Sequence, residues 1–200
     1  VQEMAERTLA RHRRHDGRIA CGPGCSHCCV LNVAVLVPEA AAVADYLLRK
    51  LDRRELARLR RRIDRLHSDI RWCSDDERIT RMQPCAFLDE AGRCGIYPVR
   101  PLLCRALTST DPETCRLAVL LHVVDESPTI LVNLFQAGLF HHSFLAFARA
   151  LATAGIDDRS RELTGAVKEL LDHAPQRPGH RASGRRRLEN DRTPTGMLPS

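Results

Sequence analysis

Apolar residues recur every three or four positions in several stretches of the chain, which predicts a mainly helical protein. The clearest case runs from Asp52 to Trp72, where one apolar stripe contains Leu56, Leu59, Ile63, Leu66 and Ile70. This spacing is typical of an amphipathic helix. The arginines at 58–65 then occupy its solvated face, and they need no nucleic-acid partner to explain them.

Four other stretches are predicted to be helical. A short basic helix covers 2–15. A second helix is predicted over 39–51, because it follows Pro38 and proline is favoured at the start of a helix. A long helix covers 133–155. We expect it to be buried on most sides, because apolar residues cover a wide part of its surface. A last amphipathic helix covers 158–172.

The remaining pattern completes a single small domain. Valine and leucine at 30–37 predict one short buried strand. Proline, glycine and arginine dominate 175–200, which predicts a disordered basic tail. The fold class is therefore mainly α, with a few short strands and an irregular cysteine-rich core. We divide the chain into a domain over 1–174, with a motif region at about 18–116 and a helical region at 117–174, and the tail.

Charge and composition exclude some partners. Six arginines and two acidic residues in 175–200 supply +4 of the net charge of +6, so the body is almost neutral. Aromatic residues make up only 4%, too few for a surface that stacks on nucleic-acid bases. Residues 127–148 carry no formal charge, but Pro128, Asn133 and Gln136 disfavour a membrane span. We therefore expect neither a nucleic-acid partner nor membrane insertion.

Nine cysteines are the most informative feature of the composition. In an oxidising compartment they would form disulfides, whereas in a reducing one they would be metal ligands or reactive thiols. No apolar stretch typical of a secretory signal precedes Ile19. We therefore expect a cytoplasmic protein and favour thiolates over disulfides.

Eight of the cysteines fall into two groups. The first is Cys21-x3-Cys25-x2-Cys28-Cys29, in a loop rich in glycine and proline, and the second comprises Cys85, Cys94, Cys104 and Cys115. About four thiolates hold a zinc ion, an iron ion or a [4Fe-4S] cluster. The sequence predicts that both groups meet around such a centre. Adjacent side chains point apart, so Cys28 and Cys29 either face two sites or comprise one ligand and one free thiol.

Other candidates have simpler explanations. Cys73 stands alone and is interpreted as a small core residue. His27 could replace a thiolate ligand, and His141 and His142 could be ligands or bases, but surface positions are favoured for all three. Glu39 suits a helix N-terminus. Five arginines near cysteines could hydrogen-bond sulfur or simply be solvated: Arg18, Arg93, Arg100, Arg105 and Arg116.

At these positions the chain resembles the CxxCxxCC family of zinc- or iron-chelating domains, the YkgJ-like cysteine-cluster proteins. The resemblance covers about 18–116. It rests on Cys21, Cys25 and Cys28-Cys29, then Pro84-Cys85-x-Phe87-Leu88, Cys94-x-Ile96-Tyr97, Arg100-Pro101, Cys104-Arg105 and Cys115. It implies a cytoplasmic, mostly helical, metal-binding protein whose relatives largely lack an assigned reaction.

Three functions follow as hypotheses. The first is a protein that binds zinc or iron, or an iron–sulfur cluster, through the cysteines. The second, implied by a similar cysteine cluster in flagellin lysine N-methylases, is an iron–sulfur enzyme that modifies a protein substrate. The third is a structural zinc module that binds a protein partner through its basic tail. The sequence contains no GxSxG, HExxH, P-loop or dinucleotide-binding motif.

Overall fold

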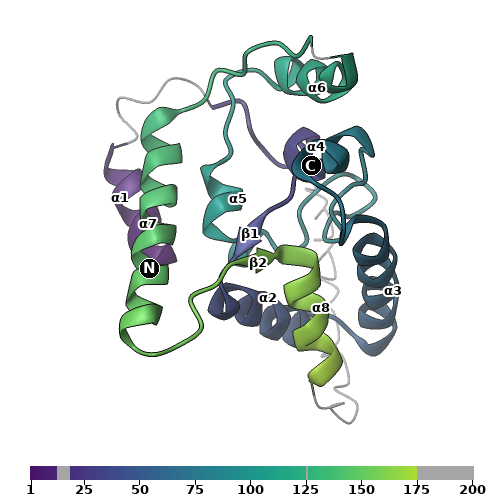
Figure 1. The fold of residues 1–200 in the computed structure, drawn as a ribbon, viewed down its shortest axis with the longest axis vertical. Coiled ribbons are helices and arrows are strands. Elements are labelled where there is room, and N and C mark those ends of the chain that lie inside the picture. The colour runs from purple at the N-terminus through teal and green to yellow at the C-terminus, as the bar shows by residue number, and fades with distance from the viewer. Residues whose placement is uncertain (13–18, 125, 175–200) are drawn as a thin grey trace, which may run out of the picture.

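The computed structural model describes residues 1–12, 19–124 and 126–174, and helices dominate them (Figure 1). Sequence analysis correctly predicted this mainly α fold. The elements in chain order are α1 (Gln2–His12), η2 (His27–Val30), β1 (Ala34–Val35), α2 (Val37–Lys50), α3 (Arg53–Ile70), α4 (Asp75–Thr80), η3 (Tyr97–Val99), α5 (Leu102–Ala106), α6 (Pro112–Leu120), η4 (His122–Val124), α7 (Leu134–Thr153), β2 (Arg161–Glu162) and α8 (Leu163–His173).

Helices α2, α3 and α8 enclose the larger of two hydrophobic cores. The predicted stripe of α3 supplies Leu59, Ile63, Leu66 and Ile70 to it. The helix begins after Asp52, whose carboxylate accepts a hydrogen bond from the Glu55 amide, while Glu55 accepts one from the Asp52 amide. This reciprocal cap satisfies two amide donors that a helix N-terminus leaves free.

Helices α1, α5 and α7 enclose the second core, beside the first (Figure 1). Phe140 and Phe144 of α7 are buried there, as is Leu9 of α1. The prediction that α7 is buried on most sides was wrong. Leu134 is 79% exposed and Leu145 is 41% exposed. The apolar composition correctly predicted a helix here, but it did not specify how many faces of that helix would be covered.

A two-stranded antiparallel sheet lies between the two cores. Ala34 pairs with Glu162 and Val35 with Arg161. Val35 belongs to the first core and Leu36 to the second, because successive side chains of an extended chain point in opposite directions. The predicted strand at 30–37 is therefore shorter than expected. The predicted start of the last helix at 158 is also wrong, because strand pairing uses 161–162 first.

Some expectations lie outside the described residues. These are the disordered tail at 175–200, the end of the first helix at 13–15, and Arg18. Within residues 1–12, 19–124 and 126–174, no helix has the length and apolar character needed to cross a membrane. The irregular motif region contains the short helices α4, α5 and α6.

Candidate metal centre

Backbone hydrogen bonds bring the first cysteine loop against the hairpin that carries Cys85 and Cys94. The Cys85 amide donates to the carbonyl oxygen of Cys29 at 2.8 Å. Leu88 forms a β-bridge with Cys94, and the Gly95 amide donates to the carbonyl oxygen of Phe87 at 2.8 Å. Residues separated by more than fifty positions in the sequence are therefore fixed next to one another.

Gly92 at the tip of this hairpin allows the close approach. Its φ is +71°, a left-handed conformation that glycine adopts without steric cost. A Cβ atom there would lie 3.3 Å from both the carbonyl oxygen of Gly24 and the hydroxyl of Ser26. Any larger residue would press the hairpin away from the first cysteine loop.

Helix α5 contributes the third segment of the site. Glu39 at the start of α2 accepts hydrogen bonds from the amides of Leu36 and Leu102, at 3.0 and 2.8 Å. Leu102 is the first residue of α5, so one carboxylate joins the N-termini of two helices and positions Cys104. The expected role of Glu39 at a helix N-terminus is thus present, together with this second contact. Its burial raises the pKa of Glu39.

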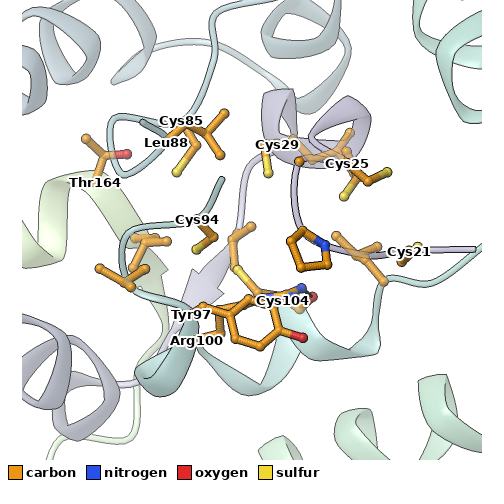
Figure 2. Close-up of a pocket in the computed structure, with 18 of the residues that line it drawn as sticks. Cys21, Cys25, Cys29, Cys85, Leu88, Cys94, Tyr97, Arg100, Cys104 and Thr164 are labelled. Atoms are coloured by element: carbon orange, nitrogen blue, oxygen red, sulfur yellow. Dashed lines mark hydrogen bonds between the residues drawn. The ribbon is translucent and has the colours of Figure 1, made fainter. Parts of the chain in front are cut away.

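These segments enclose a cavity of about 100 Å³. One water molecule needs only ~10–15 Å³ of comparable volume, so the cavity has room for more than a single small ion. Seven of the eight cysteines proposed as ligands line it: Cys21, Cys25, Cys28, Cys29, Cys85, Cys94 and Cys104. Figure 2 shows Cys85 and Cys94 on one side, Cys21 and Cys25 on the other, and Cys29 between them.

Cys115 does not line the cavity but lies beside it. It is on α6, which packs against η2, and its charge contributes to a raised pKa of Cys21. We call Cys85, Cys94 and Cys104 the inner cysteines, and Cys21, Cys25 and Cys115 the outer cysteines. Repulsion from Cys28 contributes to the raised pKa of Cys21, Cys94 and Cys104, so this thiol is close to both sets.

Burial keeps the inner thiols protonated. Desolvation is the largest cause that raises the pKa of Cys85 and of Cys104, each to about 12. It also raises the pKa of Cys94, although Arg100 opposes the rise. The pKa of Cys28 is raised mainly by its hydrogen bond with Cys29 and then by burial. A metal that binds here must displace protons from these thiols.

All nine cysteines lie in the described residues, and none is in a disulfide. Within that part of the chain, however, no group of three or more His, Cys, Asp or Glu side chains has the geometry to hold a metal ion. The sulfurs share a cavity but do not form a closed ligand set. The donor chemistry nevertheless fits zinc or iron, because both accept thiolate ligands.

Cys73, His141 and His142 occupy the positions that their simpler explanations predict, whereas His27 is half-buried in η2 instead of exposed in a loop. Cys73 packs against the larger core, and its thiol donates to the carbonyl oxygen of Asp69 at 3.4 Å. His141 and His142 are exposed on α7. His27 is in η2, outside the cavity lining.

The arginines near the cysteines divide into surface and cavity residues. Arg93 pairs with Asp89, and Arg116 pairs with Glu113, both at the surface. Arg100 lines the cavity and donates to the carbonyl oxygen of Cys104. Arg18 lies outside the described residues. Of the other four arginines, Arg100 and, through its hydrogen bond to the carbonyl oxygen of Arg100 at 2.8 Å, Arg105 are placed to support metal ligands.

Three polar lining residues were missed by sequence analysis. Arg78 reaches the cavity from α4, while Glu162 and Thr164 reach it from β2 and α8. None of them has a cysteine within four positions in the sequence, so no spacing signal could have identified them. The run of acidic residues before Arg78 is typical of a helix N-terminus and does not point to a metal site.

Comparison with known proteins identifies the family of the chain. Residues 20–120 match the CxxCxxCC family, described as "Putative zinc- or iron-chelating domain". The chain belongs to the CxxCxxCC family. No curated protein and no solved structure matches the chain. The CxxCxxCC assignment covers every cysteine of both groups, and it leaves the substrate and reaction open.

Proposed function

We propose that the cysteine-lined cavity is a metal centre that binds zinc or iron through thiolates of both cysteine groups. One observation carries this proposal: seven cysteines from three separated segments line the same cavity. The structural role of cysteine as a small core residue does not account for so many thiols around one space. The proposed ligands are Cys21, Cys25, Cys28, Cys29, Cys85, Cys94, Cys104 and Cys115.

The inner cysteines and Cys28 are the strongest ligand set. Burial is the main cause of the raised pKa values of Cys94 and Cys104, and repulsion from Cys28 adds to both. A bound cation would remove this repulsion and hold the thiolates in place. The outer cysteines then either complete the same centre with Cys29 or hold a second ion.

The protein would function in a reducing compartment, and we propose the cytoplasm. Thiolates persist there, whereas in an oxidising compartment neighbouring cysteines would form disulfides. If the metal is an iron–sulfur cluster, the centre could also transfer electrons. Methyl transfer to a protein and partner binding through 175–200 stay predictions from the sequence alone.

The experiment is metal analysis of the full chain purified without oxygen, together with its visible spectrum. We expect at least one equivalent of zinc or iron per chain, and a charge-transfer absorption band if the metal is in an iron–sulfur cluster. A colourless protein with stoichiometric zinc would eliminate the redox version. A chain without either metal, even after reconstitution, would contradict the proposal.

A further inference from the structure

Arg78 is the most buried charged side chain of the site. It is 2% exposed, and its Nε donates to the carbonyl oxygen of Val30 at 3.0 Å. Its Nη1 group is buried and has no hydrogen-bond partner. The side chain lines the cysteine cavity. The lining of the cysteine cavity therefore includes an arginine with a buried donor group that no protein group accepts.

Within the described residues, Arg78 forms no ion pair. Glu162 is the acidic residue with the largest influence on its charge, but the Glu162 carboxylate accepts its hydrogen bonds from the Gly165 amide and the Thr164 hydroxyl, both at 2.9 Å. Burial lowers the pKa of Arg78, yet a guanidinium keeps its proton in proteins. An unpaired buried cation is unfavourable, so this arrangement needs a source of negative charge.

The cysteines can supply that charge when they bind metal. Protonated thiols are neutral, but four thiolates around one divalent ion leave a net negative charge. Cys85 and Cys73 are the thiols whose charges influence Arg78, and Cys85 lines the cavity with it. Arg100 cannot fill the same role as fully, because it already donates to the carbonyl oxygen of Cys104.

We propose that Arg78 is the buried counter-charge of the cysteine centre, and that its free Nη1 group donates a hydrogen bond to a cysteine sulfur when metal is bound. The proposal rests on the metal-binding function given above. It makes Arg78 a positioning residue that favours metal centres with a net negative charge. It also means that the metal-free chain carries an unfavourable buried cation, which metal binding relieves.

The test compares Arg78→Gln, which removes the charge, with Arg78→Lys, which keeps it. Zinc affinity of the full chain is measured without oxygen by competition with a chromophoric chelator, and melting temperatures are measured with and without zinc. We expect Arg78→Gln to weaken zinc binding about 10–100-fold, the range typical of residues that support metal ligands. Arg78→Lys should weaken it less. The melting temperature of metal-free Arg78→Gln should equal or exceed that of the wild type.

Arg81→Met is the matched control. Arg81 is exposed, donates to the carbonyl oxygen of Asp69 at 3.2 Å, and does not line the cavity. This variant should bind zinc as the wild type does. Wild-type affinity in Arg78→Gln, or equal losses in the Gln and Lys variants, would overturn the proposal. So would equal destabilisation of the metal-free and loaded forms, which indicates a purely structural role.

The outcomes separate the two proposals. If the wild type binds no zinc or iron, the metal-binding function itself is wrong, and the role of Arg78 falls with it. If the wild type binds metal and only the role of Arg78 is wrong, the affinities of the variants reveal it. If Arg78→Gln does not fold, Arg78→Lys decides: near wild-type affinity supports the proposal, and a loss of 100-fold or more contradicts it.

Discussion

The inner and outer cysteines lie at or beside one cavity, but their surroundings are very different. Cys85, Cys94 and Cys104 pack against the larger hydrophobic core. Cys21 is exposed in a loop with two glycines, and Cys115 is on α6, a helix with no buried residue. Metal bound by the inner cysteines would therefore be held by the same contacts that stabilise the fold. Metal bound by the outer cysteines would exchange with solvent more easily.

The largest effect should come from removing an inner thiol. In Cys104→Ser we expect metal affinity to fall by more than the ~10–100-fold seen when a supporting residue is lost, because a direct ligand is removed. Metal analysis and chelator competition measure this. Cys73→Ser is the control, since Cys73 is outside the cavity lining, and it should keep its metal. Equal metal content in Cys104→Ser and the wild type would contradict the assignment.

Removing an outer thiol should have a smaller effect. Cys21 accepts a hydrogen bond from the Ser109 amide at 3.2 Å, but it is exposed, unlike the outer cysteines Cys25 and Cys115. For Cys21→Ser we expect an affinity loss of roughly 10-fold or less, with faster metal exchange measured by chelator competition over time. If Cys21→Ser loses metal as completely as Cys104→Ser, the distinction between inner and outer cysteines is wrong.

The raised thiol pKa values predict two opposite dependences on pH. Metal binding must release thiol protons, so affinity should increase as pH rises from 6 to 8, which titration at several pH values would measure. Metal-free stability should behave in the opposite way. The folded-state pKa of Cys85 and Cys104 is about 12, above the ordinary 9.0, so the folded chain retains protons that the unfolded chain loses. Its free energy of unfolding should decrease as pH rises from 9 to 12.

A metal affinity that does not change with pH would show that metal binding releases no protons from thiols. For the metal-free chain, denaturation in urea at pH 8 and pH 10 gives the second comparison. The Cys85→Ser variant serves as its control, because it removes one of the two thiols whose pKa is raised to about 12 and should reduce the pH dependence.

The smallest effects on metal binding are expected from substitutions of two glycines, one in a strained and one in an unstrained position. Gly92→Ala places a Cβ in a left-handed conformation and against the first cysteine loop, so it should destabilise the protein by ~1–3 kcal/mol and weaken metal binding. Gly138→Ala in α7 meets no atom within 4 Å and should stabilise by ~0.5–1 kcal/mol without changing metal binding. Urea denaturation measures both. A neutral Gly92→Ala would show that the hairpin tip does not press on the loop.

The parts of the fold that sequence analysis identified are those with local signals. The stripe of α3 and its reciprocal Asp52–Glu55 cap are both encoded within about twenty residues. The two cysteine groups could also be identified from the spacing of their cysteines. The helix over 133–155 was predicted to be buried on most sides because it is apolar, yet Leu145 of α7 is exposed. Burial depends on what packs against a helix, and local sequence does not contain that information.

The same reasoning explains what was missed at the site. Arg78 and Glu162 reach the cavity only because α4 and β2 pack beside the cysteine segments. Both residues matter because of their three-dimensional proximity to the cysteines, and Arg78 also because of its unused hydrogen-bond donor. Neither property has a sequence pattern. Conversely, Arg93 and Arg116 are near cysteines in the sequence but pair with acidic residues at the surface.

The central claim is that sulfur from both cysteine groups binds a metal, and X-ray absorption spectroscopy of the full chain loaded with zinc without oxygen tests it most directly. We predict that sulfur at about 2.3 Å dominates the metal's coordination shell. The Cys28→Ser and Cys104→Ser variants, each measured separately, should have fewer sulfur ligands than the wild type. A shell of only nitrogen and oxygen at about 2.0–2.2 Å, or a sulfur shell unchanged in both variants, would contradict the account.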